Sequence, residues 1–298
     1  MQSVAHEIAA NITGKVKLQE PLKYHTSFKI GGPADLYVQV QNVRELVYVL
    51  SLLQQNGIPW FILGNGTNLL VHDEGYRGSV IHLSGKFKDF KFNGLMLEAG
   101  AAVPLAVLAR RANSLGLSGL TFAGGIPGTV GGAVVMNAGA HGHCLSEVLV
   151  DVQILDSSLE LHTCQASELG LNYRKSKISS SEIICFVRFQ LEAGDKVELE
   201  RQSRDYLMFR HNRQPRQPNA GSIFKNPPDT AAGSLIEAAG LKGYRVGGAM
   251  ISDIHANFIV NCQQATAQDV MTLINIVRRK VAQQFGIELE LEVRLLGY

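Results

Sequence analysis

The sequence predicts a globular protein of mixed helices and strands, organised around two glycine-rich loops. Several stretches repeat apolar residues at the spacing of an amphipathic helix, and the block from 147 to 192 is rich in the β-branched residues that favour strands. Residues 121–142 carry seven glycines, and a shorter loop, 64–68, follows an apolar run. A chain of 298 residues is long enough for two or three small domains that share buried interfaces.

Composition excludes several classes of protein. A hydrophobic content of 46% with 18% charged residues is typical of a globular chain and not of a disordered one. The net charge of +2 gives no basis for binding nucleic acid, and no apolar run approaches the ~20 residues of a membrane span. The four cysteines lack metal-ligand spacing, and the N-terminal stretch lacks the pattern of a secretory signal. We therefore expect a cytoplasmic protein with no metal, no membrane partner and no nucleic-acid partner.

The N-terminal region predicts one clear helix. Residues 1–20 are expected to form a short helix and then a loop. Between 22 and 40, a Gly-Gly-Pro turn separates two short segments, which predicts a hairpin or a strand–turn–strand. The stretch 42–56 has Asn42 as N-cap, apolar residues on one face and Gly57 as its stop, so it predicts a helix.

Strands surround the next helix. The apolar run 58–63 predicts a strand that leads into the shorter glycine loop, and 79–83 and 95–99 predict two more. Residues 103–115 predict a helix with Pro104 in its first turn. The earlier helix, 42–56, is flanked by strands with short connections, which predicts a βαβ-like unit there.

A change of composition divides the chain after the strand block. Residues 195–212 predict a charged helix, and the following sequence RQPRQP, at 213–218, predicts a linker and the main domain boundary. A short helix around 234–239 and a strand-and-turn region over 244–260 are expected beyond it.

The last forty residues predict a helix and a strand. The helix, 266–285, begins with Thr266 and Asp269 in the relation of a capping box. The stretch 287–295 alternates apolar and polar residues throughout, which predicts a strand with one polar face. That polar face consists of Glu288, Glu290, Glu292 and Arg294.

The glycine loops suggest an anionic ligand. Without side chains in the way, successive backbone N–H groups can converge on a phosphate. Two such loops about sixty residues apart suggest one extended ligand with a pyrophosphate, held from two sides. The alternative is a pair of tight turns at a domain surface.

Three polar residues are candidates for chemistry, each with a plain alternative. Ser222 follows a glycine and could act as a proton donor, or it could be an ordinary turn serine. Arg174, beside further cations, could clamp a carboxylate or phosphate, or it could lie on a solvated basic turn. Glu292 is not distinguished from Glu288 and Glu290, which favours an exposed sheet face. The residues alone therefore indicate a nucleotide- or dinucleotide-using enzyme of unknown reaction.

Seven blocks of sequence carry a resemblance to a known family. They are HTSFKIGGPADLYV (25–38), GNGTNLLV (64–71), GLTFAGGIPGTVGGAVVMNAGAHG (119–142), NYRKSK (172–177), AGSIFKNP (220–227), AAGLKGYRVGGAMISDIHANFIVN (238–261) and ELEVRLLG (290–297). In this order they resemble the UDP-N-acetylenolpyruvoylglucosamine reductases, flavoproteins of peptidoglycan synthesis. They cover nearly the whole chain, which is far more specific than a single glycine motif. The short stretch between Arg174 and Ser222 is similar to the type II form of these enzymes.

The resemblance implies an α+β fold. It predicts an FAD-binding region of the vanillyl-alcohol-oxidase (PCMH) type over 1–212, made of two subdomains split near residue 85. A smaller α/β substrate domain over 213–298 follows, and its C-terminal strand returns a catalytic Glu to the active site. The glycine loops become the pyrophosphate cradle of a non-covalent FAD. The implied cofactor-binding residues are Gly64, Asn65, Gly66, Thr67, Asn68, Gly124, Gly125, Ile126, Pro127, Gly128, Gly131, Gly132, Asn137, Ala138 and Gly139.

The resemblance also implies a reaction. NADPH reduces the flavin, and flavin N5 then delivers hydride to C3 of UDP-N-acetylglucosamine enolpyruvate, giving UDP-N-acetylmuramate. Arg174 and Glu292 are expected to polarise the substrate carboxylate, and Ser222 to give a proton to C2. Burial and like charge are expected to raise the pKa of Glu292, so that it can donate a hydrogen bond. The substrate-binding candidates are Tyr173, Lys225 and Asn226.

Two other functions stay open on the sequence. Another FAD-dependent oxidase of the same fold would share the glycine loops, and a non-catalytic nucleotide-binding module would take up no flavin. Thr67 stands where the family often has Ser, and Ile254 stands where a longer polar residue is expected. We expect a monomer.

Overall fold

The computed structural model describes all residues from 1 to 298 and divides the chain into two compact units. Unit 1 consists of Met1–Leu18, Leu36–Gly64 and Gly78–Arg210. Unit 2 consists of Gln19–Asp35, Asn65–Arg77 and His211–Tyr298. Each unit has its own hydrophobic core. None of the helices is both long enough and apolar enough to cross a membrane.

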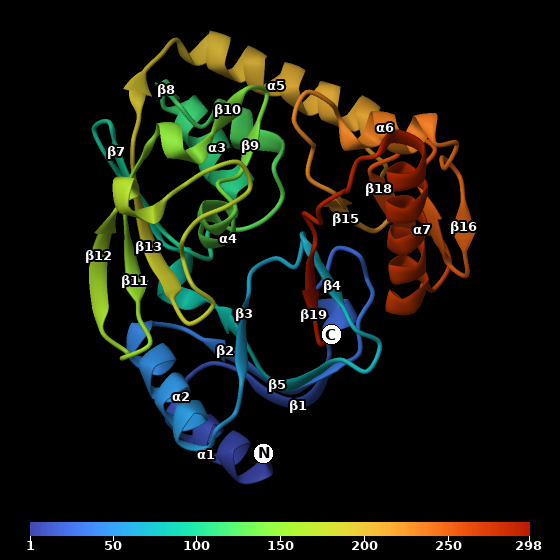
Figure 1. Ribbon diagram of the computed structural model, residues 1–298. Helices are drawn as coiled ribbons and strands as arrows, with labels where there is room; N and C mark the ends of the chain where they lie inside the picture. The colour runs from blue at the N-terminus through green and yellow to red at the C-terminus, as the bar shows by residue number, and fades with distance from the viewer. The chain divides into compact units, whose positions relative to one another are not determined.

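Unit 1 is built on a five-stranded antiparallel sheet. Its strand order is β12-β11-β13-β7-β6, with one face covered by the short helix α4, which packs on β13 and β7 (Figure 1). Asp151 of β11, which is buried, lies directly opposite Arg188 of β13 and forms an ion pair with it. The strands are β6 (Phe90–Asn93), β7 (Met96–Gly100), β11 (Leu149–Leu155), β12 (Leu161–Gln165) and β13 (Ile183–Gln190).

Besides α4 (Val130–Val135), unit 1 contains the helices α1 (Gln2–Asn11), α2 (Val43–Gln55) and α3 (Leu105–Ser114). The chain leaves the unit through α5 (Lys196–Arg213). Small strand pairs join β8 (Leu117–Ser118) to β14 (Glu192–Ala193) and β9 (Gly139–Ala140) to β10 (His143–Cys144).

The chain passes from one unit to the other within three strands of a four-stranded sheet, whose order is β1-β2-β5-β3. The strands of this sheet are β1 (Val16–Pro21), β2 (Pro33–Val40), β3 (Trp60–Leu63) and β5 (Tyr76–Leu83). The three strands in which the chain passes between the units are β1, β2 and β5. In unit 1, β3 pairs with β5 in parallel, from Trp60 opposite Ser79 to Leu63 opposite His82. Because β3 ends at Leu63, the shorter glycine loop begins at a strand end.

Unit 2 places helices on a second four-stranded sheet of order β15-β18-β17-β16. Helix α7 packs against β16 and β17, and α6 packs against α7 (Figure 1). A separate parallel pair joins β4 to β19. The elements are β4 (Leu69–Val71), β15 (Asn219–Ser222), α6 (Ala232–Ala238), β16 (Arg245–Val246), β17 (Ala249–Ile251), β18 (Phe258–Asn261), α7 (Ala267–Phe285) and β19 (Arg294–Leu296).

Helices with clear caps form where the sequence predicts them. The Asn42 side chain accepts from the backbone N–H of Glu45 at the start of α2. Thr266 and Asp269 form the expected capping box of α7, which ends at Gly286 in the left-handed conformation. Pro104 is the N-cap of α3 and lies one residue before its first turn, which corrects its predicted place.

Three other expectations need correction. The segment 16–21 forms strand β1 where a loop was expected, and only the second half of 22–40 is a strand. The glycine segment 121–142 is not one loop, since it contains a 3-10 turn (Thr121–Gly125) and α4. The C-terminal strand is short: only Arg294–Leu296 forms a strand, paired with β4, and Leu291 before it forms a single antiparallel bridge with Phe224.

The main domain boundary lies close to the point where the chain leaves unit 1. Arg210 ends unit 1 and His211 begins the last part of unit 2, within α5. Unit 2 also takes in Gln19–Asp35 and Asn65–Arg77, which the linker at 213–218 did not indicate. The division into an FAD-binding region and a substrate domain by function stays a prediction.

Candidate active site

The first two glycines of the longer loop face helix α5. A Cβ on Gly124 would lie 3.0 Å from Ser203 Oγ, and one on Gly125 would lie 3.2 Å from Arg210 Cδ. Burial lowers the pKa of Arg210 from its ordinary value. Glycine is therefore needed at 124 and 125 for close packing of α5, which is a reason other than the predicted contact with a ligand.

The backbone N–H groups at the start of α4 have partners within unit 1. Val130 N donates to Val103 O at 2.9 Å, and Gly131 N donates to Ala101 O at 2.8 Å. The N–H of Gly132 donates to the side chain of Thr129 at 3.3 Å. The N–H groups of Gly131 and Gly132 are therefore already used within the protein. These glycines can still let a ligand approach the backbone closely, and Gly132 is exposed.

The two glycine loops meet at one point. A Cβ on Gly64 would lie 2.8 Å from Oγ1 of Thr129, in unit 1. Gly128, directly before Thr129, has a φ of +125°, a conformation that strongly favours glycine. The sequence predicted two loops that serve one ligand, and this contact between bare backbone and Thr129 is consistent with that arrangement.

The rest of the shorter loop is held within unit 2. A Cβ on Gly66 would lie 2.2 Å from the carbonyl oxygen of His25, so no larger residue fits there. Ser27 N donates to Gly66 O at 3.1 Å, and Ser27 Oγ donates to Asn219 O at 2.6 Å. Ser27 therefore ties the loop to strand β15, which carries Ser222.

The end of the longer loop supports the turn that carries Arg174. Arg174 Nη2 donates to Gly139 O at 3.1 Å. Asn137 is buried; its Nδ2 lies 3.3 Å from Asn172 O, and its Oδ1 accepts from Ser146 N at 3.0 Å. The Asn137 side chain was expected to bind the cofactor, but it holds the loop to the 172–175 turn. The cofactor role of Asn137, Ala138 and Gly139 stays a prediction.

Arg174 has an unusual backbone conformation. Its φ is +53°, within a tight turn closed by hydrogen bonds between Asn172 and Lys175 in both directions. Its guanidinium lies 5.2 Å from the centre of the Tyr173 ring, a cation–π contact. A left-handed arginine costs conformational energy, and such strain concentrates at functional sites. The structure therefore favours a functional Arg174 over a solvated basic turn.

A histidine stacks on α5 beside this loop. The His141 ring lies 3.8 Å from the Tyr206 ring, centre to centre, and nearly parallel to it. Burial lowers the pKa of His141, and the positive charges of Arg210 and His143 add to that effect. The stack therefore joins the end of the longer glycine loop to α5 within unit 1.

The strand that carries Ser222 is irregular. Strand β15 pairs with β18, and the register shifts between Asn219 and Ser222. In this shifted segment Gly221 has a φ of +77°, and its N–H donates to Asn219 Oδ1 at 2.9 Å. Such irregularities are common next to active sites. Ser222 is the last residue of this irregular strand, and its role as a proton donor stays a prediction.

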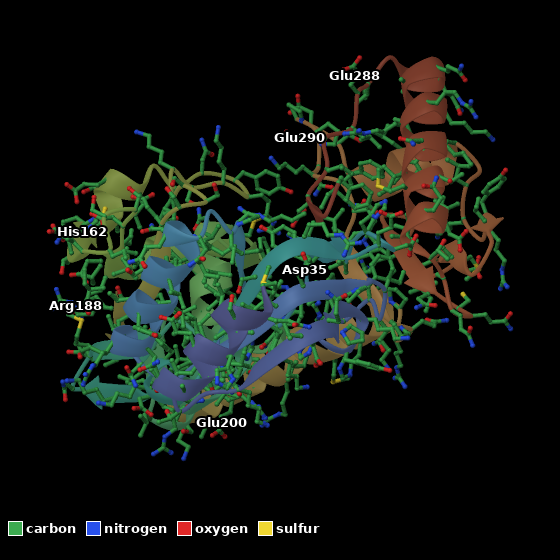
Figure 2. All side chains as sticks on the ribbon, turned by 90° about the horizontal axis from the view of Figure 1, so that it is seen from below. Asp35, His162, Arg188, Glu200, Glu288 and Glu290 are labelled. Carbon is green, nitrogen blue, oxygen red and sulfur yellow. The ribbon has the colours of Figure 1, made fainter.

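Glu292 lies beside Ser222 in unit 2. The N–H of Glu292 donates to the carbonyl oxygen of Ile223 at 2.8 Å, and Ile223 directly follows Ser222. Glu292 is half-buried, whereas Glu288 and Glu290 are exposed. Figure 2 shows these two residues on the segment after α7, with side chains that extend outward. The structure thus separates Glu292 from its two neighbours, which the sequence pattern could not do.

The three substrate-binding candidates have partners of their own. Lys225 forms an ion pair with the exposed Glu290. Asn226 Oδ1 accepts from Ala232 N at 3.0 Å, at the start of α6. Tyr173 is about half exposed and lies against Arg174. Their role in binding a substrate stays a prediction.

Sequence reasoning missed Asn257. Its side chain is only 3% exposed, and it takes both backbone polar groups of Phe224: Phe224 N donates to its Oδ1 at 2.9 Å, and its Nδ2 donates to Phe224 O at 2.8 Å. The backbone of Asn257 also accepts from Ile223 N at 2.8 Å. A buried amide inside an apolar strand signal, as in HANFIV, was the available clue.

Comparisons with family models match both halves of the chain. Residues 34–165 match the family described as the FAD binding domain. Residues 214–296 match the C-terminal domain of UDP-N-acetylenolpyruvoylglucosamine reductase.

Similar structures support the fold class that was predicted. The UDP-N-acetylenolpyruvylglucosamine reductase of Thermus caldophilus superimposes with a TM-score of 0.83 at 39% identity, over 96% of this chain and 99% of that one. The wild-type BBE-like 1 protein of Physcomitrella patens superimposes with a TM-score of 0.60 at 13% identity, over 94% and 88%, which shows the fold alone. The predicted α+β fold of the FAD-binding type is confirmed.

Curated relatives cover the whole length. UDP-N-acetylenolpyruvoylglucosamine reductase 2 of Symbiobacterium thermophilum is 46% identical over 96% of this chain and 93% of its own length. The enzyme of that name from Bacillus subtilis is 41% identical over 100% and 99%. Because this similarity runs through both units and both glycine loops, the chain belongs to the UDP-N-acetylenolpyruvoylglucosamine reductase family.

Proposed function

We propose that the chain is an FAD-dependent oxidoreductase that reduces UDP-N-acetylglucosamine enolpyruvate to UDP-N-acetylmuramate, with NADPH as reductant, in peptidoglycan synthesis. NADPH supplies a hydride and a proton completes the product, so the vinyl CH₂=C of the substrate becomes CH₃–CH and NADP⁺ is released. The family membership and the matched FAD binding domain support this reaction.

The residues of the glycine loops fit a cofactor bound through phosphate. No acceptor within the protein takes the backbone N–H groups of Asn65 and Gly66, at the end of strand β3. In unit 1, the glycines 64, 128 and 132 leave backbone without side chains around Thr129. Such backbone suits a negatively charged group. We assign the cofactor contact to these positions together with Thr67, Ile126 and Pro127, and the Gly124–Gly125 pair to the packing of α5.

When bound, FAD would supply the hydride chemistry between NADPH and C3 of the enolpyruvyl group. The protein's own residues manage the charge and the proton. Arg174 pairs with the substrate carboxylate, where negative charge grows as C3 gains hydride. Glu292, in the protonated form that the sequence analysis expects, would donate a hydrogen bond to the same carboxylate from its half-buried position.

Ser222 gives its hydroxyl proton to C2. A serine hydroxyl is a weak acid, so the alkoxide that it leaves needs nearby positive charge. Lys225, three residues after Ser222 and paired with the exposed Glu290, is our candidate for that support. A proton from solvent then restores the hydroxyl.

The observation that carries the proposal is the pairing of Ser222 and Glu292 around the Ile223 carbonyl in unit 2. A proton donor and a carboxyl group that the sequence separates by seventy residues share one short segment of backbone. Two residues fixed in this way can act on adjacent atoms of one small acid, namely C2 and its carboxylate.

An anaerobic experiment tests the proposal. We expect the purified protein to be yellow, NADPH to bleach it, and UDP-N-acetylglucosamine enolpyruvate to restore the colour. The variant Ser222→Ala should keep bleaching by NADPH and lose about 10²- to 10⁴-fold in the rate of recolouring, the usual contribution of a general acid. Ser234→Ala, at an exposed position of α6, is the matched control and should behave as wild type.

Two results would contradict the proposal. A protein whose flavin is re-oxidised only by oxygen is an oxidase of the same fold. A protein that takes up no flavin is a nucleotide-binding module.

A further inference from the structure

We infer that Asn68, at the end of the shorter glycine loop, is a positioning residue for Glu292 and not a ligand of the cofactor through its side chain. The inference rests on the proposed function, because it assigns Asn68 to the residue that is proposed to act on the substrate carboxylate. Both residues belong to unit 2.

Asn68 holds the backbone of Glu292 from two sides. The Asn68 side-chain amide Nδ2 donates to the carbonyl oxygen of Glu292 at 3.0 Å. The carbonyl oxygen of Asn68 itself accepts from the N–H of Arg294 at 3.1 Å. Asn68 thus provides the hydrogen-bond partner of both the Glu292 carbonyl and the Arg294 N–H.

The strand pairing explains why Asn68 can do this. Leu69 of β4 lies opposite Arg294 of β19 in parallel register, so the residues just before these two strands come together. Glu292 lies outside β19, where no backbone ladder continues. The Asn68 side chain supplies the hydrogen bond that a further strand residue would otherwise supply, as asparagines commonly do outside regular elements.

A third hydrogen bond links this arrangement to Ser222. The N–H of Glu292 donates to Ile223 O at 2.8 Å, so the backbone of Glu292 is fixed by Asn68 through its carbonyl and by the Ser222 segment through its N–H. Glu292 is half-buried. If one of these hydrogen bonds were lost, we expect the backbone of Glu292 to move, because water does not simply take the place of the lost partner. Displacements of about 1 Å can cost about 100-fold in the rate of a reaction that needs exact placement.

The test separates the two half-reactions. Flavin content, bleaching by NADPH and recolouring by UDP-N-acetylglucosamine enolpyruvate are measured by anaerobic stopped flow. For Asn68→Ala we expect normal flavin content, a normal rate of bleaching and recolouring slowed about 10- to 100-fold. Asn68→Asp keeps the size of the side chain and loses the donor, so it should be as slow. Asn275→Ala, at an exposed position of α7, is the control and should behave as wild type.

A double variant distinguishes positioning from a general structural effect. If Asn68 acts through Glu292, Asn68→Ala combined with Glu292→Gln recolours no more slowly than Glu292→Gln alone, because coupled residues are not additive. Independent, multiplicative losses would overturn the inference. So would a loss of flavin or of bleaching in Asn68→Ala and Asn68→Asp, which would make Asn68 a cofactor ligand.

The same set of variants tells this inference apart from the proposed function. If Glu292→Gln recolours at the wild-type rate, the proposed role of Glu292 fails, whatever Asn68 does. If Glu292→Gln is slow and both Asn68 variants are normal, only the inference about Asn68 fails. A melting curve for each variant checks that it is folded, and Asn68→Asp serves if Asn68→Ala does not fold.

Discussion

Several residues of this protein act by holding the backbone of another residue. Asn257 is the clearest, because its buried side-chain amide pairs with both the N–H and the carbonyl of Phe224, two residues after Ser222. Only an amide offers an acceptor and a donor at this spacing. The position of the segment that follows Ser222 therefore depends on a buried amide 33 residues after Phe224 in the sequence.

We expect Asn257→Ala to lower the free energy of unfolding by about 3 kcal/mol, because it leaves a buried N–H and a buried carbonyl without partners, at about 1–3 kcal/mol each. Denaturant unfolding followed by circular dichroism measures this, with Asn275→Ala on the exposed face of α7 as the control. A loss equal to that of the control would mean that water replaces the amide without cost.

Helix α7 shows how one element is held at its end by charge. The Thr266–Asp269 capping box is joined by Asp73, whose two carboxylate oxygens accept from the backbone N–H groups of Ala267 and Gln268 at 2.8 and 3.0 Å. A carboxylate is favoured there by the positive end of the helix dipole. Asp73 also ties the Asn65–Arg77 segment of unit 2, which carries most of the shorter glycine loop, to α7.

The cap predicts a pH dependence of stability. Burial acts to raise the pKa of Asp269, but hydrogen bonds from the N–H groups of Thr266 and Gly248 and from the Thr266 side chain outweigh it, so the pKa is lowered. An Asp with a lowered pKa in the fold contributes stability above its unfolded pKa of about 3.9, and that contribution is lost as the pH falls through the folded value. We expect Asp269→Asn to reduce the loss of stability between about pH 5 and pH 3. Urea unfolding across that range checks it; parallel curves for the two proteins would count against the assignment.

The whole molecule has two cores, one in each unit, and it belongs to a family with an FAD binding domain. A ligand that binds only the folded chain adds to its stability by mass action. Because there are two cores, we expect thermal unfolding to depart from the single two-state transition of a small domain.

Removal of FAD should therefore lower the melting temperature. At a free FAD concentration of 100 times its Kd, the bound form should be more stable than the flavin-free form by about 2.7 kcal/mol. Calorimetry of the flavin-free protein with and without added FAD measures this, and added riboflavin, which has no pyrophosphate, is the control. Equal stabilisation by riboflavin would show that the glycine loops do not hold the pyrophosphate.

The sequence by itself determined the elements whose signals are local. Helices α2 and α7 follow from apolar spacing and from caps within a few residues, and the family follows from ordered blocks, which the comparisons confirm. The glycines of 121–142 predicted a single loop and hid the 3-10 turn and α4 within it, and they could not reveal that Gly124 and Gly125 lie against α5, a helix some eighty residues later.

Only the tertiary structure decided which polar residues matter and how they are held. The alternation over 287–295 predicted one long strand, yet only Arg294–Leu296 forms one, because its partner β4 is just as short and the pairing with Phe224 is a single bridge at Leu291. Glu292 differs from Glu288 and Glu290 through contacts with Ile223 and Asn68, which lie 69 and 224 residues away in the sequence. Periodicity reports which face of an element is apolar, whereas burial and hydrogen bonding of a single polar group depend on the distant segment that packs against it.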